Sequence, residues 1–263
     1  MKGAFMMDQA REQQILALLS EKKYATIERL SKNLFVSEST IRRDIHSLAE
    51  KGLVQRHKGG VALVTITEIE ATSDFKRSQH YDEKLKIARA AIDFIGHRQL
   101  IFLDSSTTSY YLAQEIAKLD HLTGTRIVTT NLSSAIALSE NENIEVYLPP
   151  GKIFNKRESL QGSQTCDYLS NYYFDNVFAS CRGITPEFGF SEFTPEEALL
   201  KRVVGSQSKQ TVVLADHSKF CTTFSFQSFM PEQVDYVLTD SPVSLEHESF
   251  FADNKIEPIA LSD

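Results

Sequence analysis

The stretch VSESTIRRDI, residues 36–45, has the spacing of a helix with one buried face. Ile41, Ile45 and Leu48 follow one another at steps of four and three, so their side chains share one side of a helix. Ser37 stands just before this pattern, where a hydroxyl can accept a hydrogen bond from one of the first free amides. The sequence therefore predicts a helix that starts directly after Ser37.

The opposite face of this predicted helix is polar and basic. At 100° per residue, Ser39, Arg43 and His46 point away from the apolar side, and Arg42 lies on its flank. Hydroxyl and guanidinium groups hold phosphates and read base edges, and a helix of this length fits the major groove of DNA. This face is a candidate for groove recognition.

The neighbouring segments extend this helix into a small module. Apolar residues at helical spacing predict two shorter helices upstream, marked by Ile15, Leu16, Leu19, Ile27, Leu30 and Leu34. Downstream, residues 53–56 and 61–64 have strand composition, and the glycines within 57–60 permit a tight turn with a basic tip at Lys58. We predict a winged helix-turn-helix domain over residues 1–64. From periodicity alone, an ordinary three-helix bundle with a solvated basic surface is the alternative.

The charge distribution separates this module from the rest of the chain. Residues 1–60 carry eleven Lys and Arg against seven Asp and Glu, a balance of +4. The whole chain carries −7, so the remaining residues carry −11. A basic module attached to a larger acidic body indicates that the first part binds a polyanion and the second part binds something else.

The larger part of the chain alternates between strand and helix patterns. Residues 65–82 lack apolar periodicity and are expected to form a linker, which leaves residues 83–263 as a second domain. Helices are expected at residues 85–95, 107–118 and 132–139, and strands at 100–103, 126–130, 144–148, 176–180, 211–215, 234–238 and 256–261. Such alternation predicts an α/β domain with a mostly parallel sheet covered on both faces.

Composition narrows the function classes further. The apolar runs are four or five residues long, far below the ~20 needed to span a bilayer, and the first ten residues lack the apolar core of a secretory signal. We therefore expect a cytoplasmic protein with no membrane partner. Cys166, Cys181 and Cys221 include no closely spaced pair, which argues against a zinc site or a disulfide framework and predicts small buried hydrophobes. No metal or cofactor is expected.

Ligands of open parallel sheets bind beyond the carboxyl ends of the strands. One such end continues into a helix through Asp104, Ser105, Ser106, Thr107 and Thr108. This loop offers free amides, hydroxyls and the positive end of a helix dipole, which together suit an anion such as phosphate. A plain capped helix start would have the same composition.

Two further pairs of charged residues have plain structural interpretations. Asp216 and Lys219 share a strand-end loop, where an acid and a base commonly form only a structural ion pair. Glu197 and Lys201 stand four residues apart on a predicted helix, and such a pair is by default a solvated surface pair.

The module closely resembles the winged helix-turn-helix of the DeoR family of bacterial transcription regulators, through residues 36–45, Leu48, Gly52, Leu53, Arg56, Gly59 and Gly60. Lys58 departs from the His that the family usually shows before the paired glycines. The later pieces are similar to the family's sensor domain, whose fold is similar to ribose-5-phosphate isomerase, so the resemblance covers roughly residues 10–260. The candidate DNA-binding residues are Ser37, Ser39, Thr40, Arg42, Arg43, His46 and Lys58.

The same resemblance implies an effector site. Residues 104–108 would form its phosphate loop, Asn131 and Gly151 would line the pocket, and Glu197, Lys201, Asp216 and Lys219 would complete it. Two positions depart from the family: Ser106 replaces a usual Gly and is expected to narrow the phosphate site, and Arg182 stands where an acid is usual. Both departures resemble the fucose-operon regulators within the family.

Together these patterns predict a transcription regulator, with repression favoured over activation, of a sugar-catabolism operon. It would bind double-stranded operator DNA as a homodimer or homotetramer and respond to a phosphorylated sugar. Two alternatives are a sugar-phosphate isomerase with an N-terminal helical appendage and an architectural DNA-binding protein whose second domain only oligomerises. An isomerase needs a placed carboxylate to move a proton, and with Arg182 in place of an acid, Glu197 is the remaining candidate.

Overall fold

The computed structural model describes residues 11, 12, 14–19, 24–50, 54–57, 59–63, 73–154 and 157–261. Contacts divide the chain into two units, Met1–Lys76 and Arg77–Asp263. Helix α4 (Ser73–Ser78) and the start of helix α5 (Tyr81–Ala91) occupy the second half of the expected linker. The second half of the predicted linker over residues 65–82 is thus largely helical and contains the boundary between the two units, while residues 64–72 lie outside the described part of the chain.

The first unit combines helices with a small antiparallel sheet. Residues 11–12 and 14–19 are helical, and they are followed by β1 (Tyr24–Thr26), α2 (Ile27–Leu34), α3 (Glu38–Glu50), β2 (Val54–His57) and β3 (Gly60–Leu63). Strand β3 lies between β1 and β2 and is antiparallel to both. The core of this unit consists of apolar residues from the predicted helices and from the strands, among them the buried Ile15, Leu19, Leu30, Ile41, Ile45, Leu48 and Val61. Leu16, Ile27 and Leu34 are partly buried and pack against this core. The winged helix-turn-helix is thus formed by the expected segments, with β1 as an added strand.

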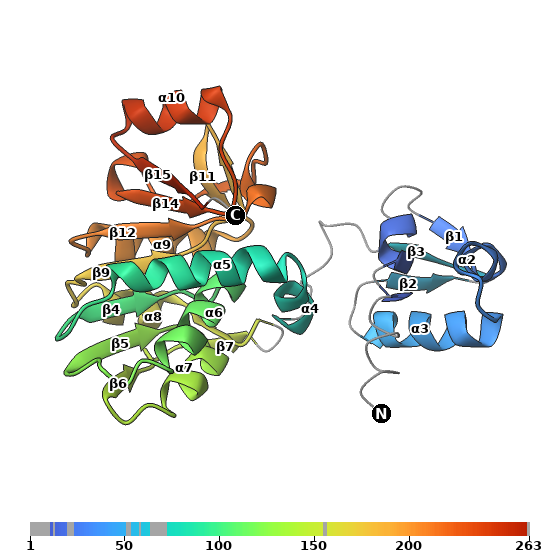
Figure 1. Ribbon diagram of the computed structural model, residues 1–263, viewed down its shortest axis with the longest axis horizontal. Helices are drawn as coiled ribbons and strands as arrows, with labels where there is room; N and C mark the ends of the chain where they lie inside the picture. The colour runs from blue at the N-terminus through green and yellow to red at the C-terminus, as the bar shows by residue number, and fades with distance from the viewer. Residues whose placement is uncertain are drawn as a thin grey trace. The chain divides into compact units, whose positions relative to one another are not determined.

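The second unit is built on a sheet of seven parallel strands (Figure 1). Its order is β15-β14-β12-β9-β4-β5-β6. The strands are β4 (Leu100–Leu103), β5 (Thr125–Thr129), β6 (Ile144–Tyr147), β9 (Asn176–Ala179), β12 (Thr211–Leu214), β14 (Tyr236–Thr239) and β15 (Glu257–Ala260). Every predicted strand of the sheet is present close to its predicted bounds, because strands buried on both faces form continuous apolar runs.

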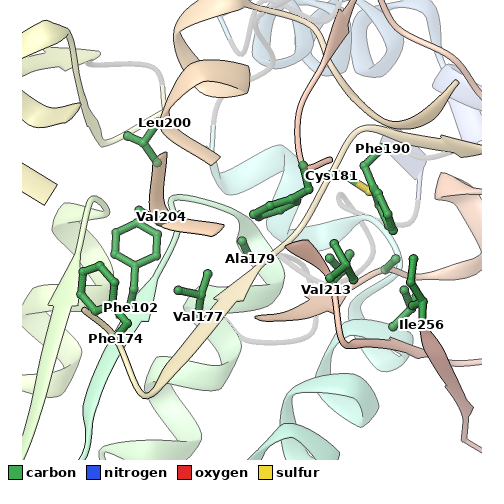
Figure 2. Packing of buried hydrophobic residues seen from close by; sticks show 14 of the residues in the cluster. Phe102, Phe174, Val177, Ala179, Cys181, Phe190, Leu200, Val204, Val213 and Ile256 are labelled. Carbon is green, nitrogen blue, oxygen red and sulfur yellow. The ribbon is translucent and has the colours of Figure 1, made fainter. Parts of the chain in front are cut away.

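Alternate side chains of each strand pack on opposite faces of this sheet. Ile101 and Leu103 of β4 join one core cluster with residues of α5, α6 (Thr107–Ile116) and α7 (Leu132–Leu138). Phe102 joins the other cluster, with α8 (Ser163–Leu169), α9 (Pro195–Ser206) and α10 (Leu245–Asp253). Figure 2 shows this second core, in which Phe102 lies beside Phe174 and below Val204 of α9. The sheet is therefore covered on both faces, as predicted.

Short strands outside the main sheet were not expected from the sequence. Strands β7 (Lys152–Phe154) and β8 (Ser159–Gln161) pair antiparallel, and β10 (Gly183–Thr185), β11 (Gly189–Glu192) and β13 (Phe226–Gln227) form a separate three-stranded sheet. A Cβ at Gly183 would lie 2.0 Å from the carbonyl oxygen of Thr222, so this close approach requires glycine.

Two remaining sequence-based expectations concern membranes and cysteines. In the described part of the chain, none of the helices has the length and apolarity needed to cross a membrane. Cys166 and Cys181 are buried as expected, but Cys221 is exposed, so its predicted role as a buried hydrophobe is wrong. Cys221 has a positive φ of 57°, which places it in a turn at the surface rather than in a core element.

Candidate functional site

Helix α3 presents the predicted polar face to solvent. Ser39, Arg42, Arg43 and His46 are exposed, whereas the apolar residues opposite them are buried. Arg42 also forms an ion pair with Glu38, with 3.2 Å between Nη2 and Oε2, and such an exposed pair is weak enough to exchange for a phosphate. The binding role of this face stays a prediction, and Lys58 lies outside the described residues.

Three hydroxyls gather at the start of α3. Ser37 Oγ accepts a hydrogen bond from the amide of Thr40 at 3.2 Å, so the predicted cap is present. The same oxygen lies 2.8 Å from Ser39 Oγ and 2.9 Å from Thr40 Oγ1. These hydroxyls stand at the N-terminal end of the helix, where the dipole favours a negatively charged group such as a DNA phosphate.

A buried ion pair that the sequence did not reveal fixes the position of α3. Arg11 of the first helix donates to Asp44, with 2.6 Å from Nε to Oδ2 and 3.0 Å from Nη2 to Oδ1. Asp44 is buried beside Ile41 and Ile45, so this two-point contact ties the first helix to the inner side of the recognition helix. In the sequence, the only indication of this contact is that Asp44 directly precedes the apolar Ile45 on the predicted helix.

In the second unit, the strand order reverses direction between β4 and β9. After β4 the chain continues through β5 and β6 on one side, and β9 starts the other half of the sheet. Ligands bind at such a switch point, beyond the carboxyl ends of the strands. Asp104 follows β4 and bridges the crevice, because its Oδ2 accepts the amide of Ser180 at 3.0 Å while its Oδ1 accepts Ser109 Oγ at 2.6 Å.

Lys201 extends from α9 into this crevice and is buried. Its Nζ donates to Glu192 and to the carbonyl of Ser180 and lies 3.5 Å from Asp104 Oδ2. Burial lowers the pKa of Lys201, but Glu192 and Asp104 outweigh this effect and raise it, so the amine stays charged. The default interpretation of Glu197 and Lys201 as a solvated surface pair is wrong, because the two residues have separate buried partners. Glu192 was missed by sequence reasoning.

Glu197 lies on the same helix but points to a different partner. Its Oε1 is 2.5 Å from Nη1 of Arg157 and accepts Gln161 Nε2 at 3.3 Å. Burial raises the pKa of Glu197, but Arg157 and Lys201 outweigh that effect and lower it to about 2. Glu197 Oε2 is buried and accepts no hydrogen bond from the described residues. Arg157 and Gln161 were not singled out from sequence, because β8 was not predicted.

The loop between β4 and α6 has the predicted features of an anion site. Ser106 caps α6, since its Oγ accepts the amide of Ser109 at 3.1 Å. Its φ of −72° and ψ of 156° are open to any residue, so serine in place of glycine does not strain this loop. Thr108 is buried and Thr107 is partly exposed, and the first amides of the helix have no acceptor within the helix itself. Replacement of the usual glycine is therefore accommodated by capping.

Asn131 follows β5, and Gly151 lies between β6 and β7. Asn131 caps α7 through Ser134 at 2.8 Å and donates to the carbonyl of Ser105 at 3.4 Å, which links the ends of β5 and β4. A Cβ at Gly151 would lie 2.2 Å from Thr165 Oγ1 and 3.1 Å from the carbonyl oxygen of Gln161. Gly151 is therefore a close-packing position next to the residue that contacts Glu197.

Asp216 and Lys219 lie at the end of β12. Asp216 is fully buried, caps the short helix η2 (His217–Lys219) through Ser218, and lies 3.8 Å from Lys219 Nζ. Both residues act electrostatically on Cys181, as do Lys201 and Glu192. The structural ion pair expected from sequence is present, and it is also part of the charged surroundings of the β4–β9 crevice.

Lys84 and Arg182 add two cations to these surroundings. Lys84 is buried on α5 and donates to the carbonyl of Gln79, and the charges of Asp216, Lys219 and Arg182 all act on it. Arg182 Nε lies 3.9 Å from Glu192. Lys84 shares a helix face with the buried Ile87, Ala88 and Ala91. The helix predicted over residues 85–95 began one residue too late to include this lysine on its apolar face.

Because Lys84 is buried, we expect the stability of the folded chain to rise with pH. Burial is the largest influence and lowers its pKa to about 8, while the unfolded chain keeps the proton up to about 10.4. Between these values the unfolded state binds more protons, so the free energy of unfolding rises with pH. Relative to Lys84→Met, the wild type should gain up to about 3 kcal/mol between pH 7.5 and 10.5 in urea unfolding.

The matched control for this prediction is Lys209→Met, because Lys209 is exposed on the same unit. Its pH dependence should follow the wild type. Equal pH slopes for the wild type and Lys84→Met would show that the amine of Lys84 does not lose its proton early.

Comparison with known proteins identifies both units. Residues 79–241 match the family model described as the DeoR C terminal sensor domain, and residues 11–67 match the DeoR-like helix-turn-helix domain. The HTH-type transcriptional regulator GolR of Listeria innocua is 31% identical over 234 residues, which cover 89% of this chain and 91% of that protein. The glycerol-3-phosphate regulon repressor of Escherichia coli K12 is 31% identical over 252 residues, or 96% and 98% of the two chains.

Among solved structures, ribose 5-phosphate isomerase A of Methanocaldococcus jannaschii is similar over 54% of this chain and 55% of that chain, with 18% identity and a TM-score of 0.39. The family matches are much stronger, since the sensor-domain match alone spans more than half of the chain. The helix-turn-helix match covers the module that contains α3. This chain therefore belongs to the DeoR family of DNA-binding transcription regulators.

Proposed function

We propose that this regulator represses a sugar-catabolism operon and that a phosphorylated sugar, bound beyond the ends of β4 and β9, changes its affinity for the operator. The observation that carries the proposal is the orientation of charge in the crevice. The side chains of Glu192 and Asp216 are 2% and 0% exposed, whereas their partners Arg182 and Lys219 are 32% and 22% exposed. The carboxylates are buried and the cations reach solvent, which favours an anionic ligand.

The loop before α6 supplies the second half of this proposed site. Helix α6 has ten residues, and the amides of Thr107 and Thr108 stand at its positive end. The partly exposed Ser105 and Thr107 add hydroxyl donors. A phosphate at this position would accept hydrogen bonds from the amides and hydroxyls, and Lys219 would add charge.

The direction of regulation is inferred from the relatives. One relative of nearly the same length is named a glycerol-3-phosphate regulon repressor, a name that joins a phosphorylated compound with repression. A ligand changes operator affinity only to the extent that it binds the DNA-competent and incompetent states differently, typically by ~1 to 3 kcal/mol. The homodimer or homotetramer and the fucose subgroup stay predictions.

The state of Glu197 disfavours the isomerase alternative. A general base works best when its pKa lies near the working pH, and Arg157 together with Lys201 holds the pKa of Glu197 at about 2 against the opposing effect of burial. At neutral pH this carboxylate is a weak base in an ion pair. We therefore propose a binding role for the crevice, and incubation with pentose and hexose phosphates should yield no isomerised product.

Sugar phosphates should stabilise the second unit, whereas the matching free sugars should not. The probes are glycerol 3-phosphate and a panel of pentose and hexose phosphates, each beside its unphosphorylated counterpart, in thermal unfolding of the full chain. At a hundredfold excess over Kd, a ligand adds about 2.7 kcal/mol, which raises Tm by roughly 5 to 10 °C in a unit of this size. Equal shifts with a sugar and its phosphate would contradict the proposal.

Two variants connect the response to this site. Lys219→Ala removes a cation and Thr107→Val removes a hydroxyl, so each should reduce the Tm shift and the effect of the ligand on operator binding. DNA binding without ligand should persist, because α3 belongs to the other unit. Lys118→Ala, at an exposed lysine near the other end of α6, is the matched control and should respond like the wild type. Normal responses in both test variants would place the ligand elsewhere.

A further inference from the structure

Three side chains from two distant segments of the second unit converge next to the end of β12. His80 directly precedes α5, Glu83 lies in its first turn, and His217 begins η2. One potential ligand atom from each of these residues lies within 4.8 Å of the other two. The rings of His80 and His217 meet edge to face, with centroids 4.9 Å apart.

The ring of His217 is oriented by a carboxylate. Asp240, which follows β14, accepts the backbone amide of His217 at 2.7 Å and lies 2.8 Å from its Nδ1. When Nδ1 donates this hydrogen bond, Nε2 carries the lone pair and is the nitrogen that can bind an ion. A carboxylate that holds the far nitrogen of a histidine is the arrangement that orients histidine ligands in metal sites.

His80 is held in a conformation that non-glycine residues rarely adopt. Its φ is 50° and its ψ is 46°, and it occupies the N-cap position of α5 without a capping hydrogen bond from its side chain. The imidazole is therefore not used to satisfy the helix.

The electrostatic surroundings of the cluster favour a cation. Glu83, Asp216 and Asp240 all act on His217. Lys84 and Lys219 lie near Asp216 and partly offset these carboxylates, but each has a contact of its own, with the carbonyl of Gln79 and with Asp216 respectively. Glu83 acts on both Lys84 and His217, and one of its carboxylate oxygens lies within 4.8 Å of a ring nitrogen of each imidazole.

We propose that His80, Glu83 and His217 bind a divalent transition metal ion, with Zn²⁺ as the best match to two imidazole nitrogens and one carboxylate oxygen. Zn²⁺ binds such atoms at about 2.0 to 2.2 Å, which places tetrahedral ligands about 3.4 Å apart, so small side-chain rotations suffice to close the site. A fourth position would be left to water or another ligand. The ion would join the start of α5 to the loop with Asp216 and Lys219. Binding of the ion at this site would not require the proposed sugar phosphate.

The test is a Zn²⁺ titration of the full chain, free of any affinity tag and stripped of metal, in competition with a chromophoric chelator. The wild type should bind one Zn²⁺ per chain with a Kd in the micromolar range or below. His80→Ala and His217→Ala should each weaken this binding at least tenfold. Asp240→Asn, which removes the orienting charge but no ligand, should weaken it roughly 10- to 100-fold.

The matched control is His97→Ala, because His97 and His121 form another exposed pair of rings in the same unit, with centroids 5.9 Å apart. This variant should bind Zn²⁺ like the wild type, and the metal-free Tm of every variant checks that it is folded. The proposal fails if the wild type binds no Zn²⁺ in this range, if both His80→Ala and His217→Ala retain full affinity, or if His97→Ala loses as much affinity as they do.

Discussion

Arg43→Ala is expected to abolish specific operator binding while the chain stays folded. Arg43 is exposed on the outer face of α3, opposite the buried Ile41 and Ile45. A guanidinium group that reads a guanine contributes roughly 1 to 3 kcal/mol per half-site, so two half-sites would lose about 2 to 6 kcal/mol. In a mobility-shift titration this corresponds to a loss of at least thirtyfold in affinity.

The matched control is Arg89→Ala, which removes an exposed arginine from α5 of the other unit. It should leave operator affinity unchanged. Weak, salt-sensitive binding to unrelated DNA should persist in Arg43→Ala, because the remaining basic residues of the first unit still contact phosphates. Unchanged operator affinity in Arg43→Ala would show that another face of the module reads the bases.

The elements that were predicted correctly are those with a strong local pattern. The central strands β9 and β12 of the parallel sheet are short, mostly apolar runs buried along their whole length, because both of their faces are covered. Helix α3 was predicted with its cap at Ser37 because its apolar residues recur over more than two turns and a hydroxyl stands at the right place. Local pattern and final environment agree at these positions.

The short antiparallel strands could not be predicted in the same way. Strand β1 has three residues, and it exists because Tyr24, Ala25 and Thr26 pair with β3 much further along the chain. Strands β10 and β11 are likewise too short to show an alternating pattern. They pair with each other across a short connection, and the third strand of their sheet, β13 (Phe226–Gln227), comes from much later in the chain. Within this sheet, only this last pairing lies outside a local window of sequence.

The same reason explains which site residues were missed. Glu197 and Lys201 are four residues apart and were expected to pair, but the fold offers each a nearer buried partner, Arg157 and Glu192. Neither partner lies on α9, so only the tertiary structure brings them to the crevice. Lys84 was detectable in principle, since its position at the apolar face of α5 can be read from the sequence.

Lys201→Met is expected to cause the largest loss of stability. Lys201 is buried against Glu192 and lies 3.5 Å from Asp104, and these carboxylates are themselves buried. Removing the cation takes the nearest positive charge from both carboxylates and leaves Glu192 with the more distant Arg182, and breaking such a buried pair typically costs 3 to 5 kcal/mol. Urea unfolding followed by circular dichroism measures this loss. Lys209→Met at an exposed site is the control and should change stability by less than about 0.5 kcal/mol.

A second substitution separates the electrostatic effect from a packing defect. If unpaired charge is the cause, Lys201→Met with Glu192→Leu should recover a large part of the loss, because an apolar pair can replace a buried ion pair. Burial raises the pKa of Glu192, and without Lys201 it should rise further. Protonation of Glu192 then stabilises the folded single variant at low pH, and this gain disappears as pH rises through the folded pKa. The loss in free energy of unfolding caused by Lys201→Met should therefore be smaller at pH 5 than at pH 8. If this loss changes neither with pH nor on addition of Glu192→Leu, its cause is a packing defect.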